Sequence, residues 1–309
     1  MATALITHEE CLQHVTPPGH PEQVARLDAV LGALEGVELT RIAAPYAADD
    51  DILRAHPPAH LAAMKRAVPN EGWRSLDADT HMSAGSLGAA LRAAGGAVKA
   101  VDMVLAGEVG NAFVATRPPG HHAEKEIAMG FCFFGNIAIA AKHALDHHGL
   151  KRVAIVDFDV HHGNGTQDLV EEDARIFFAS THQMPLYPGT GYPEETGAHD
   201  NVLNIPLADG ADSGAFRDMM EAHILPAVSK HKPELILISA GFDAHARDPL
   251  AGMLLTEDDF AWATQKICDL ADEHCGGKVV SCLEGGYDLE ALAASARAHV
   301  DVLKERADG

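Results

Sequence analysis

The sequence predicts an α/β fold in which a central, mostly parallel sheet is flanked by helices on both faces. Short runs of aliphatic and β-branched residues recur along the chain, and Ala-rich segments with helical periodicity separate them. Runs without polar alternation are typical of strands buried on both faces, as in parallel sheets. The alternation continues along 309 residues without a linker or a shift in composition. We therefore expect a single domain, residues 1–309.

Four apolar runs are the expected strands. They are Ala112–Thr116, Arg152–Val156, Leu235–Ser239 and Lys278–Leu283. The expected helices are Gly85–Leu105, Asn136–His148, Ser213–Ser229, Glu257–Glu273 and Leu289–Glu305. Residues 183–212 are rich in Pro and Gly, so we expect a long loop there, a feature that is often functional in a compact domain.

The composition narrows the classes of partner. The formal net charge is −22, and 47% of the residues are hydrophobic. Such an acidic surface repels phosphate backbones and anionic lipids, so we expect neither a nucleic acid nor a membrane partner. The longest apolar run is too short to span a bilayer and the N-terminus has no basic segment, which predicts a cytoplasmic protein. The 5 cysteines lack a C-x2-C pair and are expected to be free thiols; a homo-oligomer remains open.

A cluster of polar residues follows each expected strand at once. The four clusters are RPPGHH (117–122), DFDVHHGN (157–164), GFD (241–243) and EGGY (284–287). In an open parallel sheet, ligands bind outside the carboxyl ends of the strands. Four separate clusters at that edge therefore predict one shared crevice.

The second cluster predicts a metal site. Asp157, Asp159 and His161 alternate, so an extended backbone would direct all three side chains to one side. Carboxylate and imidazole suit zinc, and a catalytic zinc has three protein ligands and one open position. We expect Asp159, His161 and Asp243 as ligands, with Asp157 available to support a ligating histidine from behind. The competing interpretation, helix capping by the acids, does not explain the two adjacent histidines.

The remaining clusters offer groups that can transfer protons. His121 and His122 follow a Pro-Pro-Gly turn, and a neutral imidazole can take a proton from water and pass it to a leaving amine. Tyr287 follows two glycines and is interpreted either as an oxyanion donor or as a packed core residue. His143 and His147 have helical spacing, but no acid pair lies near them in the sequence. We expect them to lie on a solvated face.

Together these motifs resemble the arginase/deacetylase superfamily, and specifically the class II histone deacetylase-like amidohydrolases of bacterial type. The matching motifs are HPEQVAR (20–26), RPPGHHA (117–123), GFCFFGN (130–136), VDFDVHHGNGTQ (156–167), YPGTG (187–191), SAGFDAHARDPL (239–250) and LEGGY (283–287). They follow the family's order, and the resemblance implies the arginase/deacetylase fold.

The resemblance implies a catalytic zinc ion and assigns roles around it. The implied zinc ligands are Asp159, His161 and Asp243. The implied catalytic residues are His121, His122, Asp157, Asn164 and Tyr287. In this assignment His122 is the general base and acid, Asp157 orients its companion His121, and Tyr287 polarises the acyl carbonyl. Asn164 replaces the aspartate of class I enzymes, so His122 would lack a carboxylate partner and remain neutral more readily.

The resemblance also implies a substrate channel for an acylated small molecule or peptide. Its expected residues are Gly130, Phe131, Tyr187 and Leu250, with two aromatic rings as walls. An acidic residue stands at the position of Leu250 in polyamine-selective relatives, which favours acyl-lysine here. Acetylpolyamines stay an alternative, because Asp77, Asp79, Glu194 or a dimer partner can supply an acidic rim. Manganese chemistry of the arginase type is disfavoured, because the Asp-x-Asp-x-His pattern fits one metal, and the complete set of polar residues disfavours a binding protein without catalysis.

Potassium is the second implied cofactor. Its expected site beside the zinc uses the side chains of Asp157 and Ser180 and main-chain oxygens of Asp159, His161 and Thr181. A second potassium site is expected at the main-chain oxygens of Val170, Asp173 and Ile176. At the position that completes this second site, Asn201 replaces an aromatic residue.

Overall fold

The computed structural model describes residues 1–308, which contain one eight-stranded sheet and one two-stranded ribbon. The order in the large sheet is β2-β1-β5-β10-β9-β6-β7-β8, and all its neighbouring strands are parallel. Its strands are β1 (Thr3–Thr7), β2 (Thr40–Ala43), β5 (Asn111–Val114), β6 (Val153–Asp157), β7 (Ile176–Gln183), β8 (Val202–Leu207), β9 (Leu235–Ala240) and β10 (Val279–Leu283). The antiparallel ribbon pairs β3 (Arg74–Ser75) with β4 (His81–Met82). The predicted α/β class with a parallel sheet is confirmed.

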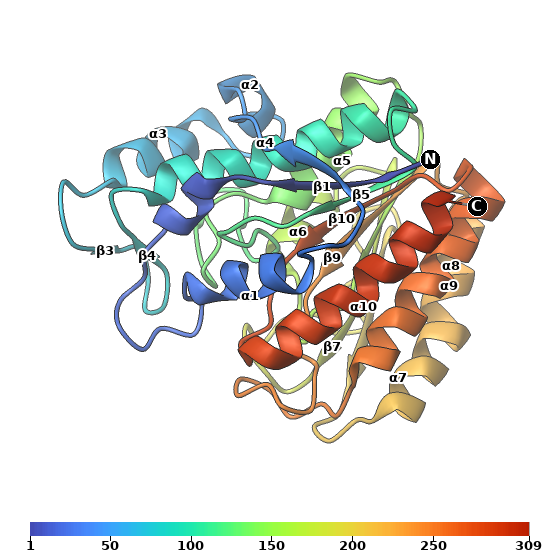
Figure 1. Ribbon diagram of the computed structural model, residues 1–309. Helices are drawn as coiled ribbons and strands as arrows, with labels where there is room; N and C mark the ends of the chain where they lie inside the picture. The colour runs from blue at the N-terminus through green and yellow to red at the C-terminus, as the bar shows by residue number, and fades with distance from the viewer. Residues whose placement is uncertain (309) are drawn as a thin grey trace.

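Helices cover both faces of the sheet, with α4 and α5 on one side and α1, α9 and α10 on the other (Figure 1). The helices are α1 (Ala25–Ala33), α2 (Asp49–Ile52), α3 (Pro58–Ala67), α4 (Ser86–Leu105), α5 (Asn136–Asp146), α6 (Asn164–Val170), α7 (Ser213–Met219), α8 (Leu225–His231), α9 (Glu257–Cys275) and α10 (Leu289–Asp308). A 3₁₀ helix, η1 (Glu9–Gln13), precedes α1, and a π-helical turn, η2 (Met220–Ile224), joins α7 to α8.

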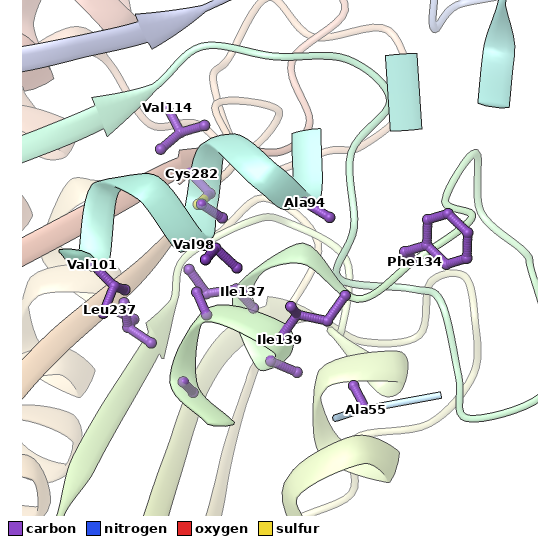
Figure 2. Packing of buried hydrophobic residues seen from close by; sticks show 14 of the residues in the cluster. Ala55, Ala94, Val98, Val101, Val114, Phe134, Ile137, Ile139, Leu237 and Cys282 are labelled. Atoms are coloured by element: carbon purple, nitrogen blue, oxygen red, sulfur yellow. The ribbon is translucent and has the colours of Figure 1, made fainter. Parts of the chain in front are cut away.

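Alternate strand residues divide the core into two layers. Ile155 of β6 packs in the layer under α4 and α5, whereas its neighbour Val156 packs in the layer under α9 and α10. Figure 2 shows Val98 of α4, Ile137 of α5 and Leu237 of β9 gathered in the first layer. Burial of each such side chain stabilises the fold by about 1.5–3 kcal/mol. The core therefore holds the strands, and with them the loops at their carboxyl ends, in fixed positions.

The sheet has more strands than the sequence predicts. The four predicted strands are confirmed as β5, β6, β9 and β10, but β1, β2, β7 and β8 were not predicted. The segment 183–212 is rich in loops, as predicted, but it also contains β8, which was not predicted. Pro206 and Asn204 conceal this strand in the sequence; Pro206 is tolerated because β8 is an edge strand.

Two further expectations concern membrane-spanning segments and the state of the cysteines. Among residues 1–308, no helix is long and apolar enough to cross a bilayer. All five cysteines are buried and free, which confirms the expectation of free thiols.

Candidate active site

The four polar clusters meet at one edge of the sheet. Strands β5, β10, β9 and β6 are neighbours in that order, so the segments that follow them lie side by side at the carboxyl edge. A cavity of about 220 Å³ opens there. Its lining residues are Asp79, His122, Gly130, Phe131, His161, Leu186, Tyr187, Leu250 and Tyr287. The predicted shared crevice is present.

Three buried side chains at this cavity have the geometry of a metal-binding group. Asp159, His161 and Asp243 each place one ligand atom within 4.8 Å of the other two. Nδ1 of His161 lies 3.2 Å from Oδ1 of Asp159 and 3.1 Å from Oδ2 of Asp243. A Cβ atom at Gly285 would lie 2.0 Å from Oδ2 of Asp243, so glycine leaves the room that the carboxylates occupy. Two carboxylates and one imidazole are a donor set that fits zinc.

The backbone reaches this geometry by a route other than the predicted one. Strand β6 ends at Asp157, and the following residues bend, so the expectation of an extended Asp157–His161 segment is wrong. Oδ1 of Asp157 accepts the N–H of Asp159 at 3.0 Å, and Oδ1 of Asp159 accepts the N–H of His161 at 2.9 Å. These local hydrogen bonds turn the chain at each aspartate. They bring Asp159 and His161 together without strand geometry.

His121 lies behind the metal-binding group. Its Nδ1 is 3.0 Å from Oδ2 of Asp157, and its Nε2 is 3.7 Å from Oδ2 of Asp159. Burial opposes the charged imidazole, but the carboxylates of Asp159 and Asp157 outweigh it and raise the pKa of His121 well above its ordinary value. A bound divalent cation would offset the charge of Asp159 and reduce this effect. Asp157 therefore holds the ring of His121. The sequence had also allowed Asp157 to support the ligating His161, and the structure shows no such contact within residues 1–308.

His122 is held in a different protonation state from its neighbour. Nδ2 of Asn164 donates to Oε1 of Glu124 at 2.7 Å, so Oδ1 of Asn164 faces Nδ1 of His122, also at 2.7 Å. An amide oxygen only accepts, so Nδ1 carries the proton and Nε2 keeps a lone pair. Burial, followed by the charges of His121 and His161, lowers the pKa of His122 well below its ordinary value. Glu124 was not predicted, because it acts on His122 only through Asn164.

Tyr287 enters the cavity from the turn after β10. It is 9% exposed, its N–H donates to Oδ2 of Asp248 at 2.7 Å, and the Arg26 guanidinium carbon lies 4.8 Å from its ring centre. Arg26 also donates to the carbonyl oxygens of Gly286 and Glu284, each at 2.6 Å. Burial raises the pKa of Tyr287 well above its ordinary value, so its phenol stays protonated and can donate a hydrogen bond.

A buried charge network, absent from the predicted site, supports the turns around these residues. Glu22 is buried and binds Arg26 at 3.0 Å and also Arg117. The carboxylate of Glu284 accepts the N–H groups of Gly120 at 2.7 Å and His121 at 3.1 Å. The sequence motifs HPEQVAR and RPPGHH already contain the charged residues of this network. Since a charged side chain that becomes buried needs a partner, these residues could have been expected to pair.

The predicted channel residues line the cavity together. Tyr187 and His122 have ring centres 5.2 Å apart, and Phe131 and Tyr287 have ring centres 5.9 Å apart, both with edge-to-face geometry. At Gly130 the backbone has φ 56°, and an added Cβ would lie 2.4 Å from Cδ2 of His122. Only glycine fits between this wall and the imidazole.

One of the three candidate rim acids is at the cavity. Asp79 lines it, and burial, followed by the charge of Asp77, raises the pKa of Asp79. Glu194 is exposed, and it is not among the residues within 1–308 that line the cavity. Leu186 also lines the cavity and was not predicted, because an isolated leucine in a Pro-rich segment carries no chemical signal.

The two expected potassium sites differ in their surroundings. Asp157 and Ser180 are register partners on β6 and β7, beside Thr181, and all three are buried. At the second site, Nδ2 of Asn201 lies 3.0–3.2 Å from the carbonyl oxygens of Val170, Asp173 and Ile176. Oδ1 of Asn201 is buried without a hydrogen-bond partner among residues 1–308, and turning the amide would place this oxygen beside the three carbonyls. The second potassium site therefore stays a prediction.

Comparison with known proteins agrees with this geometry. The sequence profile of the histone deacetylase domain matches residues 20–303. The histone deacetylase-like amidohydrolase of Pseudomonas aeruginosa is 41% identical, with 92% of this chain and 81% of the relative covered. A probable deacetylase of Archaeoglobus fulgidus is 42% identical over 94% of this chain and 82% of its own. The crystal structure of the HDA15 HD domain superposes with a TM-score of 0.93 at 33% identity, covering 99% of this chain and 89% of that one.

Proposed function

Because the chain belongs to the histone deacetylase family, we propose that it is a zinc-dependent amidohydrolase. In this proposal residues 1–309 form one catalytic domain that removes an acetyl or other short acyl group from an acylated amine. The observation that carries it is the meeting of three zinc-type ligands with His122 and Tyr287 at one narrow cavity. Family membership supports the deacetylase chemistry, and the donor set supports zinc.

The residues around the cavity divide the work of amide hydrolysis. Zinc, when held by Asp159, His161 and Asp243, supplies a Lewis acid for the acyl carbonyl and for water. Nε2 of His122 takes a proton from water as the water oxygen attacks the acyl carbon. The Tyr287 hydroxyl donates to the carbonyl oxygen as negative charge develops on it. When the C–N bond breaks, the leaving nitrogen takes the proton from His122, and the carboxylic acid and the free amine leave; the acid then gives its proton to the amine or to solvent.

The shape of the cavity supports a slender substrate. Phe131 and Tyr187 both line the cavity, where Tyr187 packs edge-to-face with His122 and Phe131 with Tyr287. An apolar chain passes such walls without needing a charge. Leu250 also lines the cavity. We propose acyl-lysine as the preferred substrate class, since these walls suit the methylenes of its side chain.

An acetylated polyamine is the second candidate, and Asp79 is the observation that favours it. Its carboxyl group lines the same cavity as Leu250 and Tyr287, where an ionised form would attract a distant ammonium group. The uncharged side chains of Phe131, Tyr187 and Leu250 line the rest of this approach, and they favour acyl-lysine over the polyamine.

Potassium binding is proposed at one site only. The side chains of Asp157 and Ser180, with nearby main-chain oxygens, supply the hard oxygen ligands that suit such an ion. Nε2 of His182 lies 2.9 Å from the carbonyl oxygen of Gly191 and donates to it, so Nδ1 accepts the hydroxyl proton of Ser180 at 3.0 Å. The lone pairs of the Ser180 oxygen then remain available to a cation. The second potassium site stays a prediction, and we propose the cytoplasm as the location.

A substrate panel with a chelator tests the proposal. Turnover of a fluorogenic acetyl-lysine peptide should be lost in excess chelator and restored by zinc, whereas a protein that only binds acyl-amines would show none at any stage. Restoration by manganese alone would favour arginase-type chemistry. Acetylated polyamines should give a lower kcat/KM than the peptide. If Asp79→Asn lowers kcat/KM for the polyamine but not for the peptide, and the polyamine is the better substrate, acyl-lysine is the wrong substrate class.

A further inference from the structure

A second group of metal-type ligands lies on helices α4 and α5. Oδ1 of Asp102 in the last turn of α4 is 2.7 Å from Nε2 of His143 in α5 and 2.8 Å from Nε2 of His148 just beyond α5. Together with His147, these residues place one ligand atom each within 4.8 Å of one another. The prediction that His143 lies on a solvated face is wrong: it is 5% exposed and has an acid beside it.

The group lies away from the catalytic cavity. Helices α4 and α5 are neighbours on one face of the sheet (Figure 1). The chain runs from the end of α4 at Leu105 to the start of β5 at Asn111, and from the end of α5 at Asp146 to the start of β6 at Val153. The group is thus at the edge where strands begin, whereas the cavity is at the edge where they end. None of its residues lines that cavity within residues 1–308.

The far side of the His143 ring has a buried nitrogen without a hydrogen-bond partner. A carboxylate only accepts, so Nε2 of His143 donates its proton to Asp102 and Nδ1 is left with a lone pair. Nδ1 is buried and has no hydrogen-bond partner within residues 1–308; its nearest acid oxygen, Oδ1 of Asp51, is 4.0 Å away. A cation bound at Nε2 moves the proton to Nδ1, where it faces the Asp51 carboxylate. Metal-bound histidines usually make such a contact on their far side.

The surrounding charges favour a cation. Asp51 and Asp102 lie beside His143, at 4.0 and 2.7 Å from its ring nitrogens. Arg54 is 3.8 Å from both Asp51 and Asp146, and Asp146 is also bound by Arg175 at 3.1 Å. The last turns of α4 and α5 add the partial negative charge of unpaired carbonyl groups.

We propose that Asp102, His143, His147 and His148 form a second zinc site that joins the ends of α4 and α5. His143 and His147 are four residues apart, and their rings stack with centres 4.8 Å apart and planes at 12°, the spacing at which two histidines on one helix face share a metal. Three imidazoles and one carboxylate complete a four-ligand set, which is typical of a closed structural site. Such a site does not depend on the proposed catalytic function.

Counting bound zinc on tag-free protein separates the two sites. The wild-type chain, dialysed against zinc and analysed by mass spectrometry, should hold two ions. Asp243→Ala should hold one, His147→Ala/His148→Ala should hold one, and the combined variant none. Both histidines are exposed, so their removal leaves the core intact. The matched control His199→Ala/His223→Ala removes two exposed histidines elsewhere and should keep two ions.

Two further readouts make the outcome decisive. Cobalt added to Asp243→Ala should produce the visible absorption of a tetrahedral site, and the added His147→Ala/His148→Ala change should abolish it. Zinc should raise the Tm of Asp243→Ala but not of the combined variant, because a ligand that binds only the folded state stabilises it. One ion per wild-type chain, or two ions in His147→Ala/His148→Ala, would overturn the proposal. Loss of catalytic turnover in Asp243→Ala with one ion still bound would leave both proposals standing.

Discussion

The two edges of the sheet assemble metal-type ligands in different ways. At the carboxyl edge, Asp159 and Asp243 are buried and already held by backbone N–H groups: Oδ2 of Asp159 accepts from Gly285 at 2.8 Å, and Oδ1 of Asp243 accepts from Val160 at 2.9 Å. At the opposite edge, two of the four ligands are exposed histidines at a helix end. The first arrangement fixes each oxygen before any ion binds, which suits catalysis. The second gains its order from the packing of two helices.

The largest expected effect follows from removing a ligand at the carboxyl edge. Asp243→Ala deletes one of the three proposed zinc ligands, so the variant should lose this zinc and at least about 10³-fold in kcat, since the ion would contribute several kcal/mol to the transition state. Zinc content and kcat are measured on the same sample, and near-ultraviolet circular dichroism checks that the core is retained. A variant that keeps both turnover and its full zinc content would show that Asp243 is not a ligand.

Tyr287→Phe is the next test, because it leaves the ligands in place and removes only one hydroxyl. Loss of an oxyanion donor costs about 10²–10³-fold in kcat, and the zinc content should not change. The ring contacts with Phe131 and Arg26 are retained by phenylalanine. If kcat stayed near the wild-type value, Tyr287 would be a packed core residue, as the sequence had also allowed.

A smaller effect is expected for the residue that acts through Asn164. Glu124→Gln replaces an acceptor-only group by an amide, so the Asn164 amide can turn and the proton on Nδ1 of His122 loses its fixed acceptor. We expect about a tenfold fall in kcat with little change in KM. This is smaller than the full contribution of a general base, about 10²–10⁴-fold, because His122 itself is retained. Glu126→Gln, two residues away and exposed, is the matched control. Equal kcat and KM for the two variants would show that Glu124 does not position His122.

The comparison of the edges also shows what a sequence can reveal. Asp159 and Asp243 were predictable because each lies in a polar cluster just after an apolar run, and parallel strands bring such positions together. Arg26 was not, because its contact with the Tyr287 ring joins segments 261 positions apart through tertiary packing. The approach of Asp102 to His143 likewise depends on the packing of α4 against α5. Reactive side chains just after a strand were therefore predictable from the sequence. Residues that act through another side chain, or through the packing of two helices, were not.

A buried histidine outside both groups of metal-type ligands provides a test by stability and not by catalysis. His299 of α10 lies between the hydroxyls of Thr264 and Ser281, at 2.6 and 2.8 Å, so both ring nitrogens are paired. Burial lowers its pKa to about 3, below the ordinary value of about 6.5 that the unfolded chain has. Its stabilising contribution is therefore complete above pH 6.5 and is lost as the pH falls toward 3.

Between pH 7 and pH 5 this single group should lower the free energy of unfolding by about 2 kcal/mol, because the unfolded state gains a proton that the folded state does not. His299→Gln keeps a polar side chain but does not titrate, so its unfolding free energy should fall by about 2 kcal/mol less over the same interval. Urea unfolding of both proteins in chelator measures the difference, and His223→Gln, at an exposed site, should match the wild type. Identical pH slopes for all three proteins would mean that His299 is protonated in the folded state at pH 5, and that pairing both nitrogens does not keep a core histidine neutral.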